Sequence, residues 1–184
     1  GNLVLTAAHC FGNARDIDDP VAQSIALDQF IAQRQITFDY EHNKNGSLAT
    51  SVSYPISKVV EFDLEGLDYA ILEIDPSAAQ LHPVARPTDN LPLNQGDSVI
   101  AINHSGGQRK SVSTGIFNGQ YKDNSWYEAV DLDVIGGASG GSLLDDDGYV
   151  ISVTAATGCD NVRYAAGGNS IHKLLEVSPA LNTV

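Results

Sequence analysis

The chain has 184 residues, of which 42% are hydrophobic and 18% charged, so it can bury a sizeable core as one domain or as two small barrels. Its formal net charge of -13 argues against nucleic-acid partners, because a phosphate backbone would be repelled. No apolar run approaches the roughly 20 residues that span a bilayer, so we expect no membrane insertion.

Short β-rich segments separated by turn residues predict an all-β barrel or sandwich. In the first half, residues 2–7 read as the end of a strand that runs into a tight turn. Further strands are expected at 35–40, 56–62 and 69–74, with an exposed polar loop over 42–53. The segment 20–33 is the exception, because Asp19 could cap a helix there and Pro20 suits its first position. The apolar residues of this short helix fall roughly on one face: Val21, Ile25, Leu27, Phe30 and Ile31.

A proline-rich stretch predicts a linker between two halves of the chain. The stretch contains Pro76, Pro83, Pro87 and Pro92, too many for regular structure. We therefore expect an N-terminal barrel over 1–75, a linker over 76–95 and a C-terminal barrel over 96–184.

The second half continues the β pattern and ends in a helix. Strands are expected at 98–103, 111–118, 126–134, 142–144 and 149–155, and a closing helix at 170–177. The acidic turn 145–148 reads as a hairpin, because it lacks the alternating ligands and distal Glu of a hand-type calcium loop. The histidines show no metal-ligand spacing, so we expect neither a metal nor another cofactor.

Three short motifs carry residues suited to amide hydrolysis. They are Thr-Ala-Ala-His-Cys at 6–10, Asp-Tyr-Ala-Ile-Leu at 68–72 and Gly-Ala-Ser-Gly-Gly at 137–141. A serine nucleophile needs an imidazole to take its proton, a carboxylate to orient that imidazole, and backbone N–H groups to meet the oxyanion. Each motif alone has an ordinary alternative: a structural histidine, a turn aspartate and a flexible glycine turn. All three together, in this order and with their flanking patterns, favour catalysis.

At these motifs the chain resembles the chymotrypsin-like serine peptidases. The resemblance implies two antiparallel β-barrels, with the first strands lying upstream of this sequence. It implies that His9 is the general base and then acid, that Asp68 orients it, and that Ser139 is the nucleophile. The N–H groups of Gly137 and Ser139 would form the oxyanion hole.

Ala138 departs from the pattern of trypsin, which has an Asp there that pairs with the newly freed N-terminus. Alanine cannot make that ion pair, so another device must organise the turn at Gly137. Bacterial branches such as the lysyl and glutamyl endopeptidases also lack that Asp, and the pattern is closest to theirs. In the family the cysteine after the catalytic histidine usually bonds an upstream one, so we expect disulfides to missing segments rather than a Cys10–Cys159 bond.

Substrate specificity leaves alternatives open. Asp133 lies six residues before Ser139, where the Asp of trypsin selects Arg and Lys, but it could equally lie on the polar face of a strand. Arg163 falls near the specificity position of the lysyl branch and could neutralise Asp133. Thr154 and Ala155 would line the strand that pairs with the substrate backbone.

The sequence thus predicts a secreted or periplasmic serine endopeptidase that acts on polypeptides through an acyl-enzyme, with cleavage after basic residues as one of the open specificities. The alternative is a catalytically silent homologue that binds peptides or proteins in the same cleft. Retention of all three triad residues favours the enzyme. The oligomeric state stays open.

Overall fold

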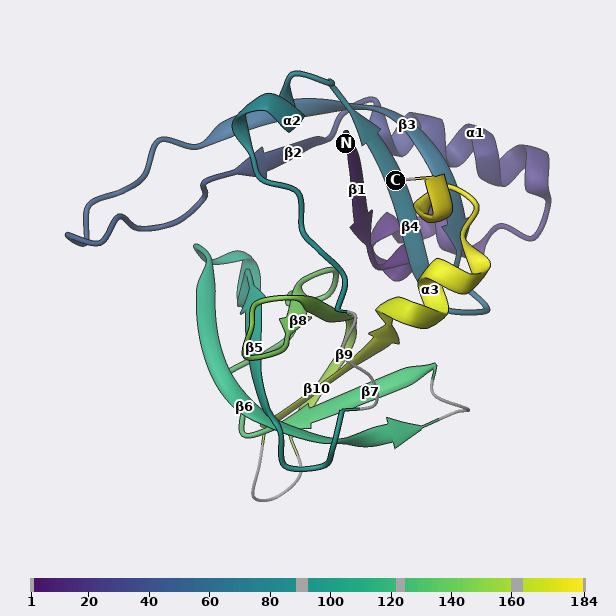
Figure 1. The fold of residues 1–184 in the computed structure, drawn as a ribbon. Helices are drawn as coiled ribbons and strands as arrows, with labels where there is room; N and C mark the ends of the chain where they lie inside the picture. Colours follow the sequence, from purple (N-terminus) through teal and green to yellow (C-terminus); the bar gives the residue numbers. More distant parts are fainter. Residues whose placement is uncertain (1, 89–92, 122–124, 160–163, 184) are drawn as a thin grey trace. The chain divides into compact units, whose positions relative to one another are not determined.

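The computed structural model of the protein describes residues 2–88, 93–121, 125–159 and 164–183. The chain divides into two compact units, Gly1–Val84 and Ala85–Thr183 (Figure 1). The first unit contains a curled four-stranded antiparallel sheet and the second a closed six-stranded antiparallel barrel. The predicted fold class, all-β with paired antiparallel barrels and few helices, is confirmed, with the first barrel present as an open sheet.

The sheet of the first unit has the strand order β1-β4-β3-β2. Its strands are β1 (Leu3–Thr6), β2 (Gln35–Phe38), β3 (Val52–Asp63) and β4 (Tyr69–Ile74). β4 lies between β1 and β3, and five of its six residues are buried because apolar side chains face both sides of a central strand. The predicted strand at 69–74 has the same bounds as β4.

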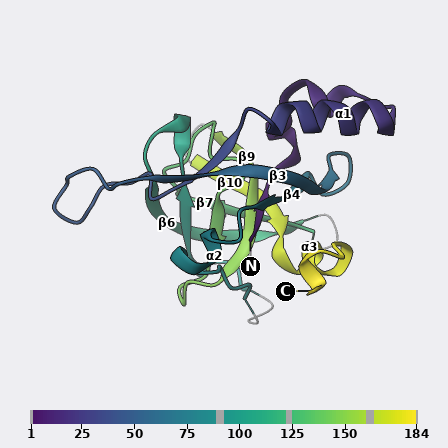
Figure 2. The ribbon, with the colours of Figure 1, turned by 90° about the horizontal axis from the view of Figure 1, so that it is seen from above.

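β3 is longer than the predicted strand at 56–62, because it begins at Val52 and continues through Pro55. Residues 52–55 pair with β2, whereas residues 56–63 pair with β4. A proline is tolerated where the strand changes partner, since its missing N–H can lie on the side without a neighbour. The loop that joins β2 to β3 extends away from the sheet (Figures 1 and 2).

The predicted helix is α1 (Pro20–Ile31), and Asp19 caps it as expected: Ala22 N–H donates to its Oδ2 at 2.7 Å. Leu27 and Ile31 are buried in the core of this unit. The prediction of a single apolar face was wrong for two residues, since Val21 is 69% and Ile25 54% exposed. At roughly 100° per residue these two lie far around the helix from Leu27 and Ile31.

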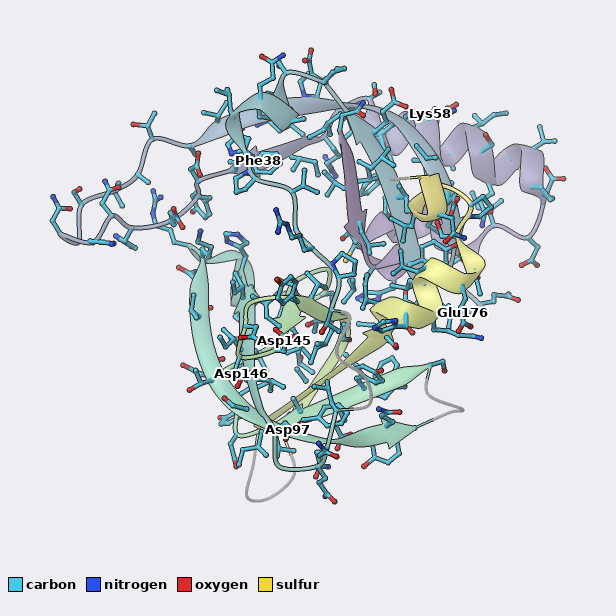
Figure 3. The ribbon with its side chains drawn as sticks, viewed as in Figure 1. Phe38, Lys58, Asp97, Asp145, Asp146 and Glu176 are labelled. Carbon is cyan, nitrogen blue, oxygen red and sulfur yellow. The ribbon has the colours of Figure 1, made fainter. Side chains whose placement is uncertain are left out.

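The expected linker contains one regular element, so the prediction of no regular structure there was wrong. The helix α2 (Ala78–Leu81) forms a single turn between Pro76 and Pro83. Its four residues, two alanines, a glutamine and a leucine, all favour helix. Next to it the ring of His82 stacks on Phe38 of β2 at a centroid distance of 4.0 Å (Figure 3 labels Phe38).

The barrel of the second unit closes in the order β10-β7-β6-β5-β8-β9 (Figure 1). Its strands are β5 (Ser98–Asn103), β6 (Ser111–Tyr121), β7 (Trp126–Val130), β8 (Ser142–Leu144), β9 (Val150–Cys159) and β10 (Tyr164–Ser170). Alternate side chains fill its interior, and the buried cluster consists of Val99, Ala101, Phe117, Tyr127, Ala129, Leu132, Val134, Ala138, Leu143, Ile151 and Ala166. The closing helix is α3 (Ile171–Val177), as predicted.

Two features of the barrel differ from the prediction. β7 ends at Val130 rather than 134, because Asp131 takes a φ of 62° that breaks the strand. β10 was not predicted, because its glycines and asparagine are rare in strands. Glycine is required there by close packing, since a Cβ added at Gly167 would meet the Trp126 ring at 2.6 Å.

The acidic turn at 145–148 joins β8 to β9 as a hairpin. Asp145 is buried and accepts hydrogen bonds from Thr88 Oγ1 at 2.7 Å and from Tyr149 N–H at 2.8 Å. Asp146 is exposed in the same turn (Figure 3 labels both carboxylates). Asp145 therefore stabilises the turn.

Within the described ranges no helix is long and apolar enough to cross a membrane.

Candidate active site

The register of β1 against β4 brings the His motif and the Asp motif together in the first unit. Thr6 pairs with Ala70, so the residues just beyond the end of β1 face those just before β4. The backbone continues this pairing, since Ala8 N–H donates to the Asp68 carbonyl at 3.3 Å. His9 is the second residue of the irregular 3-10 segment Ala8–Asp16 on one side, and Asp68 stands directly opposite.

Asp68 holds His9 through two hydrogen bonds. Its Oδ1 accepts from the His9 backbone N–H at 2.8 Å, and its Oδ2 lies 2.6 Å from His9 Nδ1. Because an ionised carboxylate only accepts, the ring carries a proton on Nδ1, and in the neutral ring Nε2 is then an acceptor. The imidazole is therefore held in the tautomer of a general base.

Asp68 adopts a left-handed backbone conformation with a φ of 49°. This conformation is unusual for a residue other than glycine, although aspartate tolerates it better than most, and it costs about 1–2 kcal/mol. It turns the carboxylate back toward both His9 donors. The side chains of His9 and Asp68 are 30% and 25% exposed, so the pair is partly buried and still in contact with water.

Cys10 follows His9 and carries a free, exposed thiol. Partial loss of hydration, and secondarily the negative charge of Asp68, raise the pKa of this thiol. The other cysteine, Cys159, lies at the end of β9, and its side chain lies outside the described part of the structure. The expected disulfides to upstream segments therefore stay a prediction.

Ser139 stands in a glycine turn of the second unit, between β7 and β8. The turn requires glycine at two positions, because Gly137 and Gly140 have φ values of 93° and 83°. β9 holds one side of the turn: Gly140 N–H donates to the Thr154 carbonyl at 2.7 Å, and Thr154 N–H donates to the Gly141 carbonyl at 2.8 Å. Ser139 is half-buried on this fixed backbone.

Ala138 faces inward from the same turn. It is 1% exposed and belongs to the apolar cluster of the barrel. A carboxylate at this position would enter that cluster instead of a polar pocket. The sequence expectation that another device organises the turn therefore has a structural basis.

The specificity candidates lie around this turn with different exposures. Asp133 is exposed between Leu132 and Val134, both of which are buried in the barrel. On β9, Thr154 is buried and Ala155 is half-buried. Arg163 lies outside the described residues.

Sequence reasoning overlooked one segment that contacts the serine turn. Residues 103–107, which begin at the last residue of β5, donate to and accept from the backbone at Ile135 and Gly136. A signal was present, because Ser-Gly-Gly at 105–107 is a second glycine turn directly after a strand.

A closed antiparallel barrel with a Gly-x-Ser-Gly-Gly turn, in a chain that also positions a His–Asp pair, defines the class of chymotrypsin-like serine endopeptidases. Comparison with known proteins gives the same class. Residues 1–153 match the trypsin-like peptidase domain, and the chain belongs to that family.

Individual proteins similar to this chain carry the names of Deg and HtrA-type proteases. Protease Do-like 5, chloroplastic, of Arabidopsis thaliana is 34% identical over 108 residues, which cover 54% of this chain and 33% of that protein. The crystal structure of Deg5 is similar with a TM-score of 0.66 and 25% identity, over 98% of this chain and 78% of that one. The HtrA-type protease AlgW, solved with a decapeptide, has a TM-score of 0.66 and 19% identity, over 99% of this chain and 49% of that one. The chain thus spans a third of the curated relative that it matches.

Proposed function

We propose that this protein is a serine endopeptidase that hydrolyses peptide bonds through an acyl-enzyme on Ser139. The observation that carries the proposal is the pair of hydrogen bonds from His9 to Asp68, at 2.8 Å and 2.6 Å. They fix the ring tautomer that a general base requires, whereas a structural histidine can serve in either tautomer.

In the proposed reaction, His9 Nε2 takes the proton of the Ser139 hydroxyl as Oγ attacks the scissile carbonyl carbon. The carbonyl π electrons move onto oxygen and form an oxyanion, which the N–H groups of Gly137 and Ser139 stabilise. As the intermediate collapses, the C–N bond breaks and His9 gives its proton to the leaving amine. Water, deprotonated by His9, then attacks the acyl carbon. The ester C–O bond breaks, His9 returns the proton to Ser139 Oγ, and the acid product leaves.

The substrates we propose are polypeptides. AlgW was solved with a decapeptide, and this chain has the same fold. Thr154 and Ala155 of β9 are proposed to line the substrate strand. Ala155 would supply the pairing backbone groups, because those of Thr154 bond the serine turn. The similarity to lysyl and glutamyl endopeptidases stays a prediction, because the relatives found carry Deg and HtrA names. The secreted or periplasmic location also stays a prediction.

Asp133 is the candidate for selecting a basic residue before the cut. Its carboxylate is exposed, so an ion pair with Lys or Arg is worth at most about 1 kcal/mol. That energy corresponds to a preference of about fivefold. Profiling a peptide library with the wild type and Asp133→Asn tests this assignment, and identical profiles would remove it while leaving the triad untouched.

Labelling with a fluorophosphonate probe tests the function itself. We expect the full-length protein to be labelled on Ser139 and to cleave fluorescent casein, and Ser139→Ala to lose both activities with an unchanged melting temperature. Ser142→Ala, three residues further on in β8, is the matched control and should be labelled like the wild type. A folded wild type that takes no label would instead favour the silent, peptide-binding homologue.

A further inference from the structure

The serine turn lacks the carboxylate with which trypsin organises its oxyanion hole, and a buried methyl group stands there instead. A methyl group can pack but cannot direct a peptide group. The structure contains a second segment that makes directed contacts to the turn: residues 103–107, which include the short 3-10 turn Ser105–Gly107 after β5.

Three contacts join this segment to the backbone just before Ser139. Gly106 N–H donates to the Gly136 carbonyl at 2.8 Å, and Ile135 N–H donates to Ser105 Oγ at 3.1 Å. The two backbones also touch, because a Cβ added at Gly137 would lie 2.9 Å from the Gly106 nitrogen. The segment therefore fixes the residues on both sides of the Gly136–Gly137 peptide.

The Gly106 contact determines where the proposed oxyanion donor points. The Gly136 carbonyl and the Gly137 N–H belong to one peptide group, and in a trans peptide these two bonds point in opposite directions. Holding the carbonyl on Gly106 therefore turns the Gly137 N–H away from residues 103–107. That N–H donates to no backbone carbonyl within the described ranges, as a group kept for an oxyanion requires.

Asn103 orients the Ser105 hydroxyl. Ser105 Oγ donates its only proton to Asn103 Oδ1 at 2.7 Å, which leaves a lone pair to accept from Ile135 N–H. Asn103 Oδ1 also accepts from Ser105 N–H at 3.0 Å and from Ser111 Oγ at 3.1 Å. Since the Ser105 backbone N–H can only donate, the amide of Asn103 must present its oxygen to this cluster.

Burying the amide group of Asn103 costs free energy, because its nitrogen makes no hydrogen bond to the described residues while its oxygen bonds Ser105. Asn103 is 3% exposed, and its buried Nδ2 has no hydrogen-bond partner in the part of the chain that the structure describes. A buried donor without a partner is rare in folded proteins. Its oxygen offsets this cost, because it accepts three hydrogen bonds, two from Ser105 and one from Ser111.

We infer that Asn103 and Ser105 are positioning residues that hold the Gly136–Gly137 peptide in the orientation required for the oxyanion hole. The inference rests on the proposed function, because it assigns these residues a role in the reaction on Ser139. They act through Ile135 and Gly106 and do not touch the substrate.

Ser111 supplies a matched control. Its hydroxyl also donates to Asn103 Oδ1, but its other contact is to the Asn103 carbonyl and not to the serine turn. Ser105→Ala and Ser111→Ala thus each remove one hydrogen bond to the same oxygen. A purely structural role for the cluster predicts equal effects of the two changes.

The experiment measures fluorophosphonate labelling of the full-length variants, separated into the affinity for the probe and the rate of the covalent step. For Ser105→Ala we expect the covalent step to slow by about 10- to 100-fold, less than the loss of an oxyanion donor itself, with the affinity within twofold. Ser105→Thr, which keeps the hydroxyl, should restore most of the rate, and Ser111→Ala should lose less than threefold. Amide hydrogen exchange of Ile135 should accelerate in Ser105→Ala alone.

The outcomes separate this inference from the function on which it rests. A labelled wild type with Ser105→Ala labelled at the same rate overturns the positioning role and leaves the endopeptidase standing. Equal losses in Ser105→Ala and Ser111→Ala also overturn it, because they indicate a structural cluster. A folded wild type without labelling overturns the endopeptidase, and the positioning role of Ser105 falls with it.

Discussion

Replacing Asp68 by asparagine changes one atom in the His9 pair and tests how the pair works. The carboxylate uses both of its oxygens as acceptors, Oδ1 for the His9 backbone N–H and Oδ2 for the ring Nδ1. Asparagine offers one oxygen and one NH2 group in the same space. It can therefore satisfy only one of the two donors in the way that the aspartate does.

The structure decides which orientation the asparagine adopts. With its oxygen on the His9 backbone N–H, its NH2 group donates to Nδ1, so the ring carries its own proton on Nε2. With its oxygen on Nδ1, two donors face each other and the backbone N–H loses its partner, at a cost of about 1–3 kcal/mol. The first orientation is therefore favoured. Because Nε2 then already carries a proton, it can no longer accept the serine proton. We expect kcat to fall about 10⁴-fold, which is about 5 kcal/mol of transition-state stabilisation.

Two measurements check this prediction. Rates of casein cleavage and of fluorophosphonate labelling give the loss in activity, and nitrogen NMR of the histidine ring gives the tautomer. The melting temperature should stay close to that of the wild type, because the favoured orientation keeps two hydrogen bonds. Activity within tenfold of the wild type, or a proton that remains on Nδ1, would refute the role assigned to Asp68.

Three further predictions concern single positions. Gly137→Ala should lower stability by about 1–3 kcal/mol and suppress labelling, because Gly137 has a φ of 93° and the new Cβ would press on Gly106; an unchanged melting curve would contradict this. Ala138→Asp should cost about 3–5 kcal/mol in urea unfolding at neutral pH, because it buries an unpaired charge, and less at acidic pH, where the carboxyl is protonated; equal costs at both would count against it. Alkylation of Cys10 should rise with pH through a midpoint above that of an ordinary thiol, and Asp68→Asn should move the midpoint down; a lower midpoint in the wild type would contradict the raised pKa.

The sequence predicted those features that depend on local patterns. β4, β5 and β8 occur at the predicted residues, because each combines β-forming residues with clear turn signals at its ends. The cap of α1 was predicted because Asp19 and Pro20 act within one turn. The closeness of His9 to Asp68 was implied by the resemblance to a known family, and the register of β1 against β4 supplies its physical cause.

Features that depend on packing between distant segments could not be predicted. β10 runs against propensity, since its glycines are needed because Trp126 packs closely on Gly167 and the Val153 carbonyl packs closely on Gly168. Val21 and Ile25 are exposed because α1 buries the face that carries Leu27 and Ile31, and the contacts that select this face come from distant segments. The hydrogen bond from Ile135 to Ser105 joins residues thirty positions apart, and no local pattern signals it.

Because Ala138 is buried and uncharged, the geometry of the serine turn does not depend on the ionic strength of the solution. An ion pair weakens as salt screens it and disappears when its amine loses a proton. Apolar packing at Ala138 and hydrogen bonds between uncharged groups at Ser105 and Gly106 have neither dependence. In a chain with a net charge of -13, long-range attraction of substrates will change with ionic strength, whereas the geometry of the turn will not.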